Sequence, residues 1–282
     1  MNRDLDMPGM SKKLSCEGVT LHYVDYGGTG STGLVMLHGG GANTHWFDFI
    51  GPSLAKHGRA LALDLRGHGD SSHMEPPIYT SDAYMQDIRA LLEAEHLQQP
   101  ILMGHSMGGM LLVKYTGTWP REVAALIVCD ARPVYGVADQ ERLQNTARSP
   151  GREYATQDDY VAHFRIRPDG LRASSEVHQY IATHTGRQLP HGTWAHKIDR
   201  RVYAQRETID TLPLYRRITC PVLFLQAESS RLTDEMVQQI KDACPQVEMT
   251  PVPDSGHHLT LDQPEQTIAR VEDFLRRHRL VG

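Results

Sequence analysis

The sequence has few cysteines, no long hydrophobic run and no excess of basic residues. Its four cysteines, among 282 residues, form no C-x-x-C pair. This is typical of reduced, buried thiols and excludes a dense disulfide framework. No segment reaches the roughly 18 consecutive apolar residues of a membrane span, and residues 1–6 carry acids where a secretory signal would be apolar. We therefore expect a cytoplasmic protein.

The charge balance and the glycine-rich turns exclude further classes. A net charge of -5 gives no electrostatic attraction to nucleic acid or to an anionic membrane surface. The 16 histidines include no H-E-x-x-H motif, and the turns at 27–30 and 39–41 match neither G-x-G-x-x-G nor a phosphate-binding loop. We expect a small-molecule substrate, no metal, no cofactor, and no nucleic-acid or membrane partner. The sequence carries no sign of oligomeric state.

Short apolar segments alternate with amphipathic segments along most of the chain. The last amphipathic segment is a helix for which Asp262 is the expected N-cap, with Glu265 three residues later. Strands that are apolar on both faces and alternate with helices predict an α/β fold with a mostly parallel central sheet and helices on both faces. The predicted strands include 33–37, 60–63, 101–103, 125–129, 222–225 and 247–250.

Residues 132–217 interrupt this alternation. The segment is too long for an ordinary loop and holds 14 Lys and Arg against 10 Asp and Glu. It predicts a helical insertion between two core strands, so that 15–131 and 218–282 form the core and 1–14 an N-terminal tail. The basic character of the insertion is compatible with an acidic substrate and equally with a solvated charged surface.

The run 104–108, GHSMG, follows one apolar strand and precedes a helix. A sharp strand-to-helix turn lifts a serine hydroxyl above the sheet, and flanking glycines give it the room that the turn requires. Parallel sheets build their sites at the carboxyl ends of strands. Ser106 is therefore the candidate nucleophile.

Residues 38–41, HGGG, also end a buried strand. Acyl transfer places negative charge on a carbonyl oxygen, which two preorganised backbone N–H groups can stabilise. We expect one N–H from Met107 and the other from Gly40, with Gly41 as an alternative.

His257 is the candidate general base. It lies in a loop between the last strand and the last helix, after Ser106 in the sequence, and His258 is the competing candidate.

Together, HGGG at 38–41, DLRGHGDS at 64–71, GHSMGG at 104–109 and Gly256-His257 resemble the α/β-hydrolase superfamily. The resemblance extends from about Ser15 to the C-terminus and is specific for the fold but not for a substrate. It implies that His257 is the base of a catalytic triad and that 132–217 is a cap over the pocket.

The triad acid departs from the family pattern. Most relatives place an aspartate after the strand that follows the cap, where this chain has QAESS at 226–230. Asp130, at the end of the strand 125–129, and Glu228 are the two candidates. Some branches of the superfamily place their acid at the position of Asp130, and because a triad is defined by geometry, we favour Asp130.

These residues predict a serine hydrolase that acts on a small carboxylic ester or lactone through an acyl-enzyme, with Ser106, His257 and Asp130 as catalytic residues. Two alternatives keep the fold. One is a cofactor-free hydrolase of carbon–carbon bonds or a ring-cleaving oxygenase, since the resemblance at Asp130 includes such branches. The other is a non-catalytic receptor that binds a small molecule under the cap.

Overall fold

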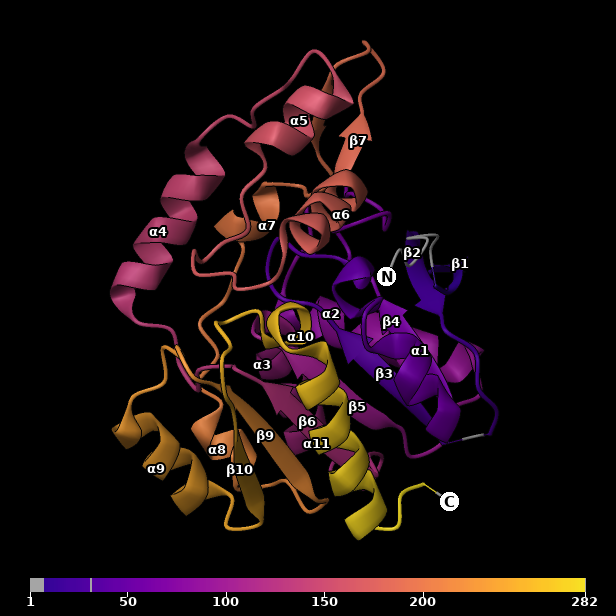
Figure 1. Ribbon diagram of the computed structural model, residues 1–282, viewed down its shortest axis with the longest axis vertical. Coiled ribbons are helices and arrows are strands. Elements are labelled where there is room, and N and C mark those ends of the chain that lie inside the picture. Colours follow the sequence, from indigo (N-terminus) through magenta and orange to yellow (C-terminus); the bar gives the residue numbers. More distant parts are fainter. Residues whose placement is uncertain (1–7, 31, 282) are drawn as a thin grey trace.

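The computed structural model describes residues 8–30 and 32–281, and an eight-stranded sheet forms its centre (Figure 1). The strands lie in the order β1-β2-β4-β3-β5-β6-β9-β10. β2 pairs antiparallel with β1 and β4, and every other pairing in this sheet is parallel. The bounds are Met10–Cys16 (β1), Val19–Asp25 (β2), Gly33–Leu37 (β3), Arg59–Leu63 (β4), Ile101–His105 (β5), Ala125–Cys129 (β6), Val222–Ala227 (β9) and Val247–Val252 (β10).

The core lies on both faces of this sheet because the central strands alternate apolar side chains between two hydrophobic layers. In β4, Leu61 and Leu63 pack on one side, whereas Ala60 and Ala62 pack on the other. All residues of β3, β5 and β6 are buried. The predicted mostly parallel α/β architecture is confirmed.

Helices cover each layer. The side of Leu61 holds α2 (Ser81–Ala94), α3 (Met107–Thr118), α8 (Leu212–Tyr215) and α9 (Asp234–Ala243), and the side of Ala60 holds α1 (Gly51–Leu54), α10 (Leu259–Asp262) and α11 (Pro264–Arg277). The short 3₁₀ helices η1 (Thr44–Phe47) and η2 (Ala55–His57) flank α1. Among the described residues, we find no helix with both the length and the apolar character needed to span a bilayer.

Two local predictions differ from the structure. Asp262 is not the N-cap of the last helix, since α11 begins at Pro264 and its N-cap is Gln263. The Asp262 carboxylate instead accepts hydrogen bonds from backbone N–H groups of Gly256 and Arg172, at 2.8 and 2.7 Å. Residues 10–14, which we assigned to a tail, form most of β1, and 1–7 lie outside the described residues.

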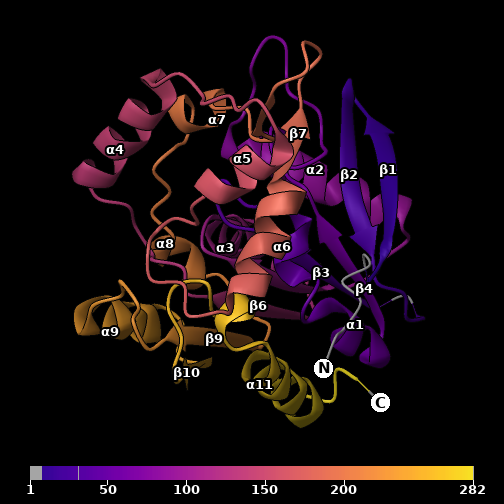
Figure 2. The same cartoon turned by 45° about the horizontal axis from the view of Figure 1, so that its top comes forward.

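Residues 132–217 connect β6 to β9; most of them rise to one side of the sheet, whereas their last helix lies beside α9 (Figure 1). They contain α4 (Val137–Arg148), α5 (Gln157–His163), α6 (Ser175–Thr185), α7 (Arg201–Ala204) and α8, and an antiparallel pair, β7 (Gly186–Gln188) and β8 (Trp194–His196), that was not predicted. Figure 2 shows α5 and α6 next to β7, with α4 beside α7. We call residues 132–217 the insertion.

A buried carboxylate fastens the insertion to the core. Asp48 accepts hydrogen bonds from the Tyr180 hydroxyl of α6 at 2.5 Å and the Tyr26 hydroxyl at 2.7 Å, and it lies 2.7 Å from Nδ1 of His45. Burial, followed by the neighbouring Asp48 carboxylate, raises the pKa of Tyr180. The hydroxyl therefore remains a donor, and α6 stays fixed over the sheet.

Candidate active site

Ser106 occupies the turn between β5 and α3. Its φ of 53° lies in the left-handed region, which non-glycine residues adopt at a cost and which strand-to-helix nucleophile turns require. The turn also needs two glycines, because a Cβ on Gly104 would lie 2.5 Å from the backbone of Gly108, and one on Gly108 would lie 2.4 Å from the carbonyl oxygen of Leu37.

His257 lies in the loop after β10 and faces this serine. Its Nε2 is 3.0 Å from Oγ of Ser106, which is within hydrogen-bond distance for proton transfer. The imidazole side chain is 16% exposed. The Nε2–H group of His105, on β5, donates to the carbonyl oxygen of His257 at 2.8 Å, so the strand that precedes Ser106 also positions the loop of His257.

Asp130 lies behind the imidazole, directly after β6. Its Oδ2 is 2.7 Å from Nδ1 of His257, and its side chain is 1% exposed. Its Oδ1 accepts hydrogen bonds from the hydroxyl of Ser230 at 2.5 Å and from the N–H of Ala227 at 3.2 Å. Both carboxylate oxygens are therefore fixed, with one directed at the histidine.

The structure separates the two candidate acids. Glu228 is half-exposed and pairs with Arg172 of the insertion at 2.6 Å, whereas Asp130 contacts His257. Ser230 donates a hydrogen bond to Asp130 and so orients it. From the sequence alone, Ser230 was noted only as part of a stretch that lacks an aspartate. The signal for this role was its place in the loop where most relatives carry the acid.

His258, the competing base, is buried behind His257. Burial, followed by repulsion from His257, lowers the pKa of His258 to about 3. Its Nδ1 is 3.4 Å from Nε1 of Trp46. His258 therefore remains neutral near pH 7 and serves as a packing residue of the loop.

The glycine turn at 39–41 borders Ser106. A Cβ on Gly39 would lie 3.2 Å from Cβ of Ser106, and one on Gly40 would lie 3.7 Å from Sδ of Met107. The turn is closed by the N–H of Ala42, which donates to the carbonyl oxygen of Gly39 at 3.1 Å. Gly39 and Gly40 thus lie close to Ser106 and to the side chain of Met107, the first residue of α3.

A cavity of about 590 Å³ opens above these residues. Ser106, His257 and Asp130 line its floor, and the insertion supplies the opposite wall, including Phe164 and His196. This volume lies within the usual range for small-molecule sites. A substrate in the cavity would therefore contact the serine hydroxyl and the insertion together.

The described residues contain one cluster with the spacing of metal ligands, formed by His22, Asp64 and Asp70. Its atoms already bind one another and the backbone, because Asp64 Oδ2 is 2.7 Å from Nδ1 of His22 and accepts the N–H of Asp70 at 2.9 Å. Burial alone would raise the pKa of Asp64, but the His22 hydrogen bond and charge lower it to about 2. The cluster connects β2 to the turn after β4 and contributes nothing to the cavity.

The chain is similar in sequence to several hydrolases. An sn-1-specific diacylglycerol lipase of Danio rerio is 27% identical to this chain, in an alignment that covers 96% of this chain and 87% of the lipase. A 2-(acetamidomethylene)succinate hydrolase of Mesorhizobium japonicum is 25% identical over 94% of this chain and 95% of its own.

Solved structures share the fold. An α/β hydrolase from Novosphingobium aromaticivorans superposes with a TM-score of 0.81 at 26% identity and covers 96% of this chain and 99% of its own. The crystal structure of E-2-(acetamidomethylene)succinate hydrolase superposes with a TM-score of 0.83 at 22% identity. The superposition covers 95% of this chain and 99% of the hydrolase chain. The model of the alpha/beta hydrolase family matches residues 34–271. The chain therefore belongs to the alpha/beta hydrolase family.

Proposed function

We propose that this protein is a serine hydrolase that cleaves a small carboxylic ester or lactone through an acyl-enzyme. The observation that carries the proposal is the continuous chain of contacts from Ser106 Oγ to His257 Nε2 at 3.0 Å and from His257 Nδ1 to Asp130 Oδ2 at 2.7 Å. A serine hydroxyl becomes a useful nucleophile when such a base removes its proton.

The proposed reaction has two halves. Ser106 Oγ attacks the carbonyl carbon while its proton moves to Nε2 of His257, and the tetrahedral intermediate then expels the alkoxide, which takes that proton. Water attacks the resulting acyl-enzyme with His257 again as base, which releases the carboxylic acid and restores Ser106. Asp130 keeps the imidazole in the required tautomer and stabilises the imidazolium.

The oxyanion of both tetrahedral intermediates would lie between the N–H groups of Met107 and Gly40. Each such donor typically contributes about 10²–10³-fold in rate. The partial positive charge at the start of α3, directly after Ser106, acts in the same direction. The positions of both residues beside the nucleophile support this assignment.

Relatives support hydrolysis and leave the substrate open. Their names include a diacylglycerol lipase, a 2-(acetamidomethylene)succinate hydrolase and an N-formylmaleamate deformylase. Hydrolysis is common to this set, whereas the group that is cleaved varies. The ester or lactone is therefore our proposal for this chain, from its serine and oxyanion geometry.

Replacement of the nucleophile tests the proposal. Ser106→Ala should lower kcat for p-nitrophenyl acetate by about 10⁴- to 10⁶-fold and abolish covalent labelling by a fluorophosphonate. Ser53→Ala, on α1 and outside the cavity, is the matched control and should behave as wild type. Labelling of the Ser106→Ala protein at another residue would contradict the assignment.

A further inference from the structure

The walls of the active-site cavity carry an excess of positive charge. Seven arginines line it, against two aspartates and no glutamate. Both aspartates are already paired, Asp130 with His257 and Asp169 with Arg167. The cavity therefore presents no free carboxylate from the described residues to balance the remaining arginines.

Three of the seven arginines have carboxylate partners. Arg132 and Arg142 both pair with Asp139, at 2.8 and 3.2 Å, and Arg167 pairs with Asp169. The other four, Arg165, Arg200, Arg206 and Arg231, form no ion pair with any residue that the structure describes.

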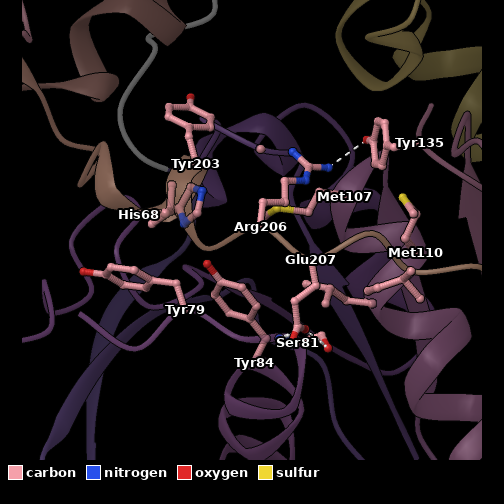
Figure 3. Close-up of a pocket in the computed structure, with 14 residues that line it drawn as sticks. His68, Tyr79, Ser81, Tyr84, Met107, Met110, Tyr135, Tyr203, Arg206 and Glu207 are labelled. Carbon is pink, nitrogen blue, oxygen red and sulfur yellow. Dashed lines mark hydrogen bonds between the residues drawn. The ribbon is translucent and has the colours of Figure 1, made fainter. Parts of the chain in front are cut away.

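Arg206 is the unpaired arginine that reaches the reacting region. A Cβ on Gly40 would lie 2.7 Å from Nη1 of Arg206, so the guanidinium lies against the glycine of the proposed oxyanion site. Nη2 of Arg206 donates to the Tyr135 hydroxyl at 2.7 Å, and Cζ is 4.6 Å from the centre of the Tyr135 ring. Figure 3 shows this contact with Met107 beside it.

The neighbouring acid does not neutralise Arg206. Glu207 turns toward α2, where its carboxylate accepts the N–H of Ser81 at 2.7 Å. A guanidinium has five N–H donors, and Arg206 uses one of them on Tyr135 among the described residues. A half-buried cation held in place with free donors is the arrangement that binds an anionic ligand group.

A second, narrow cavity meets the first at Arg206. It measures about 30 Å³ and is lined largely by apolar and aromatic residues, including Tyr84, Met110 and Leu111. Both cavities are bordered by Gly40, Tyr135, Tyr203 and Arg206. Arg206 therefore separates a small apolar recess from a large basic chamber.

We propose that Arg206 binds a carboxylate of the substrate, so that the preferred substrate is a small anionic ester. This proposal rests on the proposed function for its reaction and adds the substrate class. The planar fork of arginine matches the two oxygens of a carboxylate, and Tyr135 fixes its orientation beside Gly40. The other unpaired arginines add a positive field that attracts such a substrate.

Matched esters test the proposal. Wild type should prefer p-nitrophenyl hydrogen succinate, charged in the acyl half, or p-acetoxybenzoate, charged in the leaving half, over neutral p-nitrophenyl butyrate and p-acetoxybenzamide. Arg206→Gln should lower kcat/KM for the preferred charged ester by about 10- to 100-fold and for its neutral counterpart by no more than about threefold. Arg206→Lys, which keeps the charge without the fork, should fall between them.

Arg152→Gln is the matched control, because Arg152 is exposed on the insertion and lines neither of the two cavities. It should retain the wild-type preference. Equal losses for charged and neutral esters in Arg206→Gln would overturn the proposal, because they would indicate a structural or oxyanion role. Tyr135→Phe, which removes one partner of Arg206 without touching its charge, should weaken the preference in a protein of normal fold.

Binding separates this proposal from the proposed reaction. Succinate should bind wild type and Ser106→Ala in isothermal titration calorimetry, and Arg206→Gln should weaken that binding about 10-fold or more. If wild type binds succinate through Arg206 but has no esterase activity, the proposed reaction is rejected and the anion site is retained. Succinate affinity that is unchanged in Arg206→Gln, or tighter binding of inorganic phosphate than of succinate, would overturn the carboxylate assignment.

Discussion

At the scale of residues, the local motifs and the long-range partners differ in how well the sequence predicts them. Ser106 is marked by its flanking glycines and its place after a strand, because the backbone turn itself demands those residues. Ser230 and Arg206 carry no such mark. Their roles depend on which side chains the fold brings to Asp130 and Gly40, and no spacing along the chain encodes that proximity.

The proposed triad acid gives the residue-scale prediction. Asp130→Asn should lower kcat for p-nitrophenyl acetate by about 10⁴-fold, because the amide cannot hold the required tautomer of His257 or stabilise its charge. Glu228→Gln is the control, and its kcat should stay within about twofold of the wild-type value, since the ion pair of Glu228 with Arg172 is exposed to solvent. A large loss in Glu228→Gln with an active Asp130→Asn would reverse the assignment.

Ser230→Ala tests the support behind that acid. It removes the hydroxyl that donates to Oδ1 of Asp130 at 2.5 Å, while the N–H of Ala227 still binds the same oxygen. We expect a loss of roughly 10- to 100-fold in kcat, corresponding to one hydrogen bond to a charged group. Steady-state kinetics with p-nitrophenyl acetate measure it, and an unchanged kcat would show that Ala227 alone suffices.

At the scale of elements, the strands of the sheet were predictable, whereas the internal elements of the insertion were not. Strands that are apolar on both faces have one stable environment, so β3, β5 and β6 could be placed from short hydrophobic runs. The insertion is built from short helices and one small antiparallel pair. Its stability comes from contacts with the core, such as Tyr180 with Asp48, which leave no periodic pattern in the sequence.

Loss of the Tyr180 hydroxyl should therefore loosen α6. Tyr180→Phe removes one of the groups that satisfy the buried Asp48 carboxylate and should lower the free energy of unfolding by about 1–3 kcal/mol. Urea denaturation measures the change. Tyr154→Phe is the control within the insertion, because Tyr154 packs through its ring on Tyr160 and His163. Equal effects of the two variants would show that Asp48 does not fasten the insertion.

At the scale of the whole molecule, several histidines are buried in the neutral form. Burial is the main cause that lowers the pKa values of His68 and His105 well below the ordinary value of 6.5, and that of His258 to about 3. The unfolded chain binds protons at these positions at a higher pH than the folded chain does. Stability from these groups is therefore complete above about pH 6.5 and declines as the pH falls toward the lowered values.

The free energy of unfolding should fall as the pH drops from about 7.5 to 5, with each such histidine contributing up to about 1.4 kcal/mol per pH unit below 6.5. Urea denaturation at several pH values measures this slope. His68→Gln should make the slope shallower, whereas His163→Gln, at an exposed position of α5, should leave it unchanged. A slope that His68→Gln does not alter would contradict the linkage.

The hydrogen bonding of β6 to its two neighbours has a consequence for how reactivity could be gained or lost. The N–H of Ser106 donates to the carbonyl oxygen of Cys129, and the N–H of the next residue, Asp130, donates to Leu225 on β9. Two members of the proposed triad are thus held by the two ladders on either side of β6, and the sheet sets their spacing. Only His257 comes from outside these strands, on the loop after β10, so a shift of that loop would separate the imidazole from Ser106 and leave the spacing of Ser106 and Asp130 unchanged.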